Sequence, residues 1–186
     1  QLDMNNSDWK KETINDILPE EFYNLIKKNK KHIEGTFPIT VIDCLDLEKT
    51  EHFILISRDK EKRKEGYYFY IRHLRTNALI GYLCIKSIDY RALKCELAYF
   101  VDEDFQGKGI ASKLVAEALD FCFSKLNMNK IFIRASVNNK GSQQIAIKQN
   151  FKQEGILRND FINNDGIFED VVYFGLLKSE YNHNEK

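Results

Sequence analysis

The sequence predicts an α+β fold in which a mixed, mostly antiparallel sheet is combined with helices. From residue 67 to residue 101 apolar and polar side chains alternate with a period of two, and short turns interrupt the pattern, which is typical of an antiparallel meander. A helical pattern at 108–126 then leads to another strand pattern, and it is long enough for a parallel crossover. Asp165-Gly166, near the C-terminus, is a strong hairpin signal.

Length and composition indicate a single domain over residues 1–186, with a loosely held lead-in at about 1–13 and a polar tail at 181–186. Lys plus Arg and Asp plus Glu both number 28, so no net charge favours nucleic acid or a membrane as a partner. No apolar run approaches the ~20 residues that span a bilayer. Four cysteines without a C-x-x-C pair are typical of reduced thiols in a cytoplasmic protein, and four scattered histidines predict no metal site.

Two helices are expected before the sheet. Pro19 opens the first, and its charge order, with Glu20 and Glu21 early and lysines late, suits the helix dipole. Phe37-Pro38 breaks the chain, and the second helix is expected over about 47–64. The apolar residues assigned to these helices are Phe22, Leu25 and Ile26 in the first and Phe53, Ile54 and Ile56 in the second.

The remaining elements follow from turn residues and periodicity. Gly81 predicts a bulge or a close approach inside a strand, and Asn150 lies where a helix ends in a left-handed residue. A short helix is expected at 142–149. Strands are expected at 67–72, 79–88, 94–101, 130–137, 151–162 and 166–177.

The loop between the strand at 94–101 and the helix at 108–126 is a candidate phosphate cradle. Gly107 and Gly109 let the backbone turn tightly, and the helix start leaves amide N–H groups without helical partners. A Walker loop is disfavoured because Lys108 is followed by Gly109 and not by Ser or Thr. A dinucleotide fingerprint fits Gly107-x-Gly109-x-x-Ser112 only loosely, since the strands upstream look antiparallel. The alternative without a ligand is a glycine turn that caps a core helix.

Gln106-x-x-Gly109-x-Ala111 resembles the pyrophosphate loop of the GNAT acyltransferases, which bind acyl-coenzyme A. The order of the expected elements is similar to the GNAT fold over nearly the whole chain, which implies a central mixed, mostly antiparallel sheet flanked by helices on both faces. Three further segments resemble the branch of ribosomal-protein N-terminal acetyltransferases that act on alanine or serine. They are Glu96-Leu97-Ala98-Tyr99-Phe100, Asn139-x-x-Ser142 with Ala146 and Phe151, and Glu154-Gly155 with Asp170-Val171-Val172-Tyr173. Ala98, Phe100 and Asn150 depart from the family pattern, which has Gly, Trp and Gly there.

The resemblance implies acetyl-CoA as the cofactor and assigns residues to it. Backbone groups of Phe100 and Val101 would hold the pantetheine arm, and Asn139 would contact that arm. The alternative role for Asn139 is a helix cap or turn. The side chain of Lys108 would add charge beside the phosphates or point into solvent. The loop residues assigned to the pyrophosphate are Gln106, Gly107, Lys108, Gly109, Ile110, Ala111 and Ser112.

Two residues are candidates for catalysis. Ser142 stands at the position proposed in this branch to protonate or hydrogen-bond the leaving sulfur, and its alternative is a first-turn role in the short helix. Glu96 is the candidate base, acting through water, and its alternative is an ion pair with a neighbouring Lys or Arg. An α-amine with a pKa of ~8 is roughly 10% neutral at pH 7, whereas a lysine is about 0.04% neutral, so one weak base favours an α-amine.

The predicted function is therefore that of an acetyl-CoA-dependent N-acetyltransferase acting on a primary amine, such as the N-terminal α-amine of a ribosomal protein. The alternative acceptors are small amines: a polyamine, an amino acid or an aminoglycoside. Ala98 and Phe100 leave open a non-catalytic acyl-CoA-binding module on the same fold. A nucleotide-binding oxidoreductase is disfavoured because no parallel βαβ set surrounds the loop. The expected partners are the amine acceptor and, at most, a second copy in a homodimer.

Overall fold

The computed structural model describes residues 8–184. Within them a seven-stranded sheet has the order β1-β2-β3-β4-β5-β7-β6, in which β4 and β5 are parallel and the other neighbours antiparallel. The predicted mixed, mostly antiparallel sheet is confirmed. The strands are β1 (Trp9–Thr13), β2 (Tyr67–His73), β3 (Leu79–Asp89), β4 (Lys94–Val101), β5 (Lys130–Ser136), β6 (Lys152–Ile162) and β7 (Phe168–Leu177). The α-helices are α1 (Pro19–Ile33), α2 (Pro38–Asp43), α3 (Leu47–Lys62), α4 (Ile110–Asp120), α5 (Lys140–Lys148) and α6 (Lys178–Asn184).

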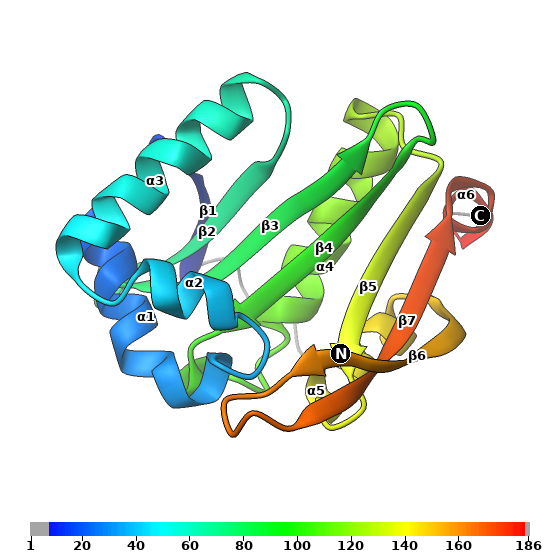
Figure 1. Cartoon of the computed structure of the whole chain (residues 1–186). Coiled ribbons are helices and arrows are strands. Elements are labelled where there is room, and N and C mark those ends of the chain that lie inside the picture. The colour runs from blue at the N-terminus through cyan, green and yellow to red at the C-terminus, as the bar shows by residue number, and fades with distance from the viewer. Residues whose placement is uncertain (1–7, 185–186) are drawn as a thin grey trace.

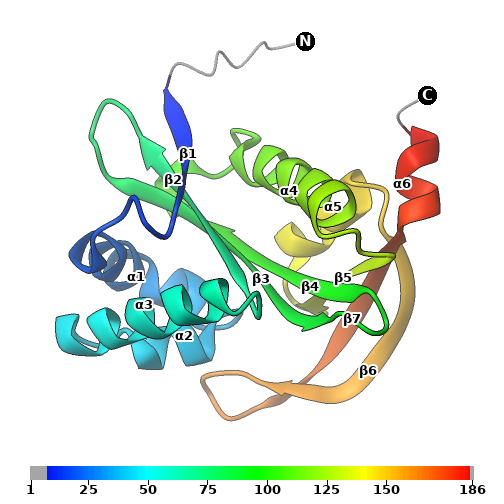
Figure 2. The ribbon, with the colours of Figure 1, turned by 90° about the horizontal axis from the view of Figure 1, so that it is seen from above.

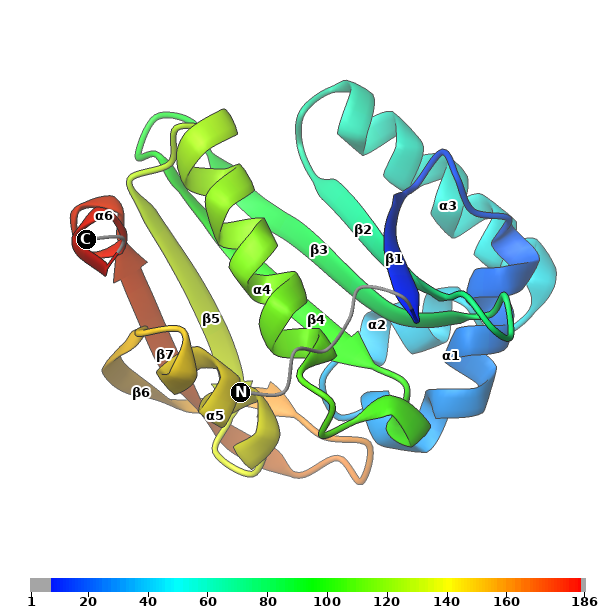
Figure 3. The same cartoon turned by 180° about the vertical axis from the view of Figure 1, so that it is seen from behind.

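Helices cover both faces of the sheet (Figure 2). Helices α1, α2 and α3 lie on one face, and α4 and α5 lie on the other, where α4 runs along β4 (Figure 3). Because successive strand residues point to opposite faces, β4 serves both cores. Leu97, Tyr99 and Val101 pack under α4, whereas Ala98 and Phe100 pack under α1–α3.

Strands β4 and β5 pair only at their beginnings. Lys94, Cys95 and Glu96 pair with Lys130, Ile131 and Phe132, and beyond Glu96 the two strands diverge (Figure 1). Strand β5 remains paired with β7 as far as Ser136. The second half of β4 therefore leaves one edge without a neighbouring strand, and this edge faces the site described below.

Three predictions about local structure are confirmed. Gly81 lies at a register shift between β2 and β3, and a Cβ added there would come within 3.1 Å of Ile71. Asn150 has a φ of 65°, in the left-handed region, and Gly166 turns the last hairpin with a φ of 74°. Both values are of the kind that Asn and Gly accept most readily.

Several boundaries were wrong. The segment Trp9–Thr13 is not a loosely held lead-in. It pairs with β2 as the edge strand β1, because Trp9 is buried in the core. The rest of the predicted lead-in, residues 1–7, lies outside the described range. The chain from Tyr181 to Asn184 is not a tail but part of α6, and the Tyr181 ring stacks on Phe123 at 4.9 Å. Pro38 does not break the chain but opens α2, since proline is suited to the first helical turn.

No helix among residues 8–184 is both long enough and apolar enough to cross a membrane.

Candidate active site

The loop after β4 is shaped by two glycines and one aspartate. Asp102 caps a short 3-10 turn at Glu103–Phe105 by accepting the Asp104 N–H at 2.9 Å. Gly107 and Gly109 have φ values of 71° and 77°, and Gly109 is the N-cap of α4. A Cβ on either glycine would meet no atom within 4 Å, so the backbone conformation, rather than crowding, demands glycine.

The backbone N–H groups at the start of α4 are available to a ligand. The first bond of the helix is donated by the Lys113 N–H to the Gly109 carbonyl at 3.0 Å. Among the described residues, the N–H groups from Lys108 to Ser112 have no acceptor. Such donors, together with the positive end of the helix dipole, favour an anion.

The loop forms one wall of a cleft of about 760 Å³. The unpaired end of β4, α5 and the turn after α1 form other parts of its lining. Lys108 does not line it, and its ammonium lies over the Phe105 ring, 5.1 Å from the ring centroid. The other predicted cofactor residues and one predicted catalytic residue do: Phe100, Val101, Gln106, Gly107, Gly109, Ile110, Ala111, Ser112, Asn139 and Ser142.

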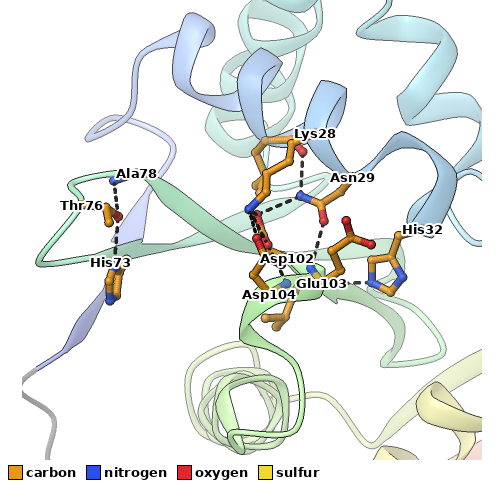
Figure 4. A network of polar contacts seen from close by, with 11 residues as sticks. Lys28, Asn29, His32, His73, Thr76, Ala78, Asp102, Glu103 and Asp104 are labelled. Atoms are coloured by element: carbon orange, nitrogen blue, oxygen red, sulfur yellow. Dashed lines mark hydrogen bonds and ion pairs between the residues drawn. The ribbon is translucent and has the colours of Figure 1, made fainter.

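A polar network ties the loop to α1 (Figure 4). The Lys28 ammonium contacts Asp102 at 2.9 Å and Asp104 at 2.7 Å, and the Asn29 amide donates to Asp102 at 3.1 Å. Asn29 Oδ1 accepts the Glu103 N–H at 3.0 Å. Burial alone would raise the pKa of Asp102, but the hydrogen bonds from Lys28 and Asn29 outweigh it and hold this pKa below its ordinary value of 3.8. The network thus fixes where the loop begins.

We expect acid to weaken this network. Because its folded-state pKa is lowered, Asp102 contributes stability that is present above its unfolded pKa of 3.8 and lost as the pH falls through the folded value. Asp102→Asn should therefore be less stable than the wild type at pH 7, and the difference should shrink below about pH 4. Urea unfolding from pH 7 to pH 2.5 measures this, with the exposed Asp43→Asn as control. A constant difference across that range would contradict the assignment.

Gln106 was assigned to the cofactor, but its side chain points to another residue of the protein. Gln106 lines the cleft, but its side-chain amide nitrogen lies 2.7 Å from Nε2 of His32 on α1. The same His32 nitrogen lies 3.2 Å from the Val101 carbonyl oxygen. The Gln106 side chain therefore adds a second tie between the loop and α1, and only its backbone remains for a ligand.

Ser142 lies in the first turn of α5 and contacts Tyr99. Its hydroxyl donates to the Tyr99 oxygen at 3.2 Å, and the Tyr99 hydroxyl donates to the Ser142 carbonyl at 3.2 Å. Burial raises the pKa of Tyr99 to about 12, so its ring stays neutral. Asn139 caps α5 by accepting the Ser142 N–H at 3.1 Å, which is the alternative role expected for it. Tyr99 was missed as a site residue, although its position two after Leu97 places it on the α4 and α5 face.

Glu96 is almost fully buried and paired. Its Oε1 accepts from Arg134 Nε at 3.2 Å, and its Oε2 lies 3.5 Å from the Ser87 hydroxyl. The alternative expected for it, an ion pair with a basic neighbour, is therefore present. Glu96 and Arg134 line a second cavity of about 120 Å³, on the α1–α3 side of the sheet. The two cavities share several lining residues, including Tyr99, Ser136 and Ser142, so they meet where β4 and β5 have separated.

Comparisons with known proteins agree with this arrangement. Residues 20–152 match the family model for the acetyltransferase (GNAT) domain. The putative ribosomal N-acetyltransferase YdaF of Bacillus subtilis is 31% identical over 108 residues, 58% of either chain. The spermidine N(1)-acetyltransferase of Vibrio cholerae is 31% identical over 60% of this chain and 71% of that protein. A crystal structure of spermidine N-acetyltransferase from Vibrio cholerae with CoA and spermine has a TM-score of 0.78 and 23% identity, covering 95% and 99% of the two chains.

Proposed function

The chain belongs to the GNAT family of acetyltransferases and is an N-acetyltransferase that uses acetyl-CoA. On this premise we propose that its acceptor is the N-terminal α-amine of a ribosomal protein. The observation that carries the site assignment is the run of N–H groups from Lys108 to Ser112 that have no acceptor in the described chain. The residues from Gly109 to Ser112 line a cleft that continues along the free edge of β4 to Ser142. The likeness to YdaF supports the acceptor, as does the larger neutral fraction of an α-amine.

The residues present suit coenzyme A. The N–H groups of Lys108 to Ser112 would hold the diphosphate, and the backbone of Phe100 and Val101 would hold the pantetheine arm along the free edge of β4. Open space beside Gly107 and Gly109 leaves room for the phosphates. Bound acetyl-CoA supplies the acetyl group as a thioester.

Ser142 and Glu96 would then act from opposite faces of the sheet. Ser142, held by Tyr99 where the cavities meet, would donate its hydroxyl proton to the leaving sulfur. Glu96 would take the proton of the amine through a water at Oε2, because Oε1 is engaged by Arg134. The proton that Glu96 receives would return to Ser142 through water, so both residues would regain their starting protonation states and the net transfer would move one proton from the amine to the leaving sulfur.

A polyamine is the second candidate acceptor, and the likeness to the spermidine enzyme of Vibrio cholerae favours it. Calorimetry with coenzyme A tests the cofactor assignment, and mass spectrometry of peptide N-termini and polyamines incubated with acetyl-CoA tests the acceptor. We expect binding of coenzyme A and acetylation of peptides that begin with alanine or serine. Acetylation of polyamines alone would refute the ribosomal proposal, and binding without turnover would favour the non-catalytic module.

Gly109→Ala should weaken coenzyme A binding by about tenfold, since a side chain disfavours the left-handed backbone by roughly 1–2 kcal/mol and the loop would turn its N–H groups away. Calorimetry measures this change. Gly155→Ala is the matched control, because Gly155 lies in β6, outside the cleft lining, and has no positive φ. Equal affinities of the Gly109→Ala and Gly155→Ala variants would contradict the role of the loop.

A further inference from the structure

Among the described residues that line the larger cavity, Glu169 is the only carboxylate. One of its oxygens accepts the Ser136 hydroxyl, and the other accepts the Asn163 side-chain amide at 2.8 Å. Both partners are neutral, and within residues 8–184 Glu169 forms no ion pair. The hydrogen bonds from Ser136 and Asn163 lower its pKa, so the carboxylate is ionised at neutral pH.

The other carboxylates nearby are compensated. Glu96 and Asp160 line the smaller cavity, and both contact the Arg134 guanidinium, at 3.2 and 3.4 Å. Lys86 lines the same cavity and brings a second positive charge to it. Glu169 is therefore the carboxylate lining these cavities that forms no ion pair within the described chain, and Lys148, which lines the larger cavity as well, is not paired with it. An ionised carboxylate has about four lone-pair positions, and two neutral donors leave some of them to a ligand.

Glu169 lies beside the place where transfer would occur. Its partner Ser136 ends β5 and lines both cavities, as Ser142 does. Gln143, the residue after Ser142, donates its side-chain amide to the Ser136 carbonyl at 3.0 Å. A chain of direct contacts thus joins Glu169 through Ser136 to the first turn of α5.

We propose that the Glu169 carboxylate binds a second, positively charged nitrogen of the acceptor and so selects acceptors with two cationic groups. The inference rests on the proposed acetyltransferase function. The attacked nitrogen must be neutral, and a carboxylate bound to it would keep it protonated, so the charge that Glu169 recognises belongs to another nitrogen. An aliphatic diamine and a peptide N-terminus followed by lysine both supply this chemistry.

The test is calorimetric titration of amines into the protein saturated with coenzyme A, which requires no turnover. A five-carbon diamine should bind about five- to tenfold more tightly than pentylamine, the matching monoamine. Glu169→Gln should reduce this preference to less than about twofold by weakening the diamine alone, since an amide can keep hydrogen bonds but not the charge. Asp165→Asn, which removes a carboxylate from the exposed turn of the same hairpin, is the control and should change neither affinity.

A second arm compares the tripeptide amides Ala-Lys-Ala and Ala-Gln-Ala and so distinguishes the two sources of the second charge. Loss of the lysine preference in Glu169→Gln supports a peptide, and loss of the diamine preference alone supports a small amine. Equal affinities of wild type and Glu169→Gln for both dications would overturn the inference. The amine titrations are repeated without coenzyme A. If the protein does not bind coenzyme A, the proposed function is refuted, and the titrations without coenzyme A still test the role of Glu169.

Discussion

Replacing Ser142 by alanine is expected to lower kcat about a hundredfold, the lower end of the range for a lost proton donor, while the Kd for coenzyme A changes by less than about twofold. Ser142 Oγ lies where the two cavities meet, and its removal leaves the Asn139 cap intact because that cap uses the Ser142 backbone N–H. The predicted effect therefore falls on the chemical step and not on the fold of α5. Steady-state kinetics with a saturating acceptor and calorimetry with coenzyme A measure the two quantities.

Tyr99 provides the internal check on this role. Its hydroxyl accepts from the Ser142 hydroxyl and donates to the Ser142 carbonyl, so Tyr99→Phe should release the serine and lower kcat by about tenfold. In the Ser142→Ala background, Tyr99→Phe should lower kcat much less than tenfold, because the effects of residues that act as one unit are not additive. Ser124→Ala, which removes an exposed hydroxyl bonded to Asp120, is the control. If Ser142→Ala kept the kcat of the wild type, the serine would have a structural role in helix α5 and no role in the chemical step.

Arg72→Met is expected to destabilise the protein by about 3–5 kcal/mol. The Arg72 guanidinium, with a side chain only 7% exposed, contacts Glu12 on β1 at 2.6 Å and Glu21 on α1 at 2.7 Å. It also donates to the Asn77 carbonyl at 2.7 Å. Removing it would leave Glu21 without its cation and the buried Glu12 with only the exposed Lys10, at 3.1 Å, and would loosen the edge strand and the first helix together.

The matched control for this prediction is Arg75→Met. Arg75 pairs with Asp8 at 3.0 Å, but its side chain is 76% exposed, and exposed pairs contribute about 0–1 kcal/mol. Urea unfolding at pH 7 gives the free energy of unfolding for both variants. If Arg72→Met and Arg75→Met lowered the free energy of unfolding by similar amounts, the buried Arg72 network would not contribute the stability assigned to it.

The parts of the fold that the sequence predicted are those in which a local pattern decides the structure. The meander, the crossover and the final hairpin follow from period-two runs and from the turns at Thr76-Asn77 and Asp165-Gly166. Strand β1 was missed because Trp9 is its one long apolar side chain, and only pairing with β2 makes it a strand. Helix α2 was missed because Pro38 reads equally as an interruption and as a helix start.

The same division applies to the site. The glycine loop was predictable because its residues are consecutive and its conformation is set by Gly107 and Gly109. The pairing of Glu96 with Arg134 was foreseen as an alternative, but its partner could not be named, since the two residues are 38 apart in sequence. The contacts of Tyr99 with Ser142 and of Glu169 with Ser136 depend on which strands become neighbours, and no local pattern reports that.

The central claim is that backbone N–H groups from Lys108 to Ser112 hold the diphosphate of coenzyme A. Two-dimensional NMR of the 15N-labelled protein, with and without coenzyme A, tests it most directly. The account predicts that the amide resonances of Lys108, Gly109, Ile110, Ala111 and Ser112 shift downfield on binding, and that pantetheine, which lacks the diphosphate, leaves them in place. Binding of coenzyme A that left these five resonances unmoved would contradict the account.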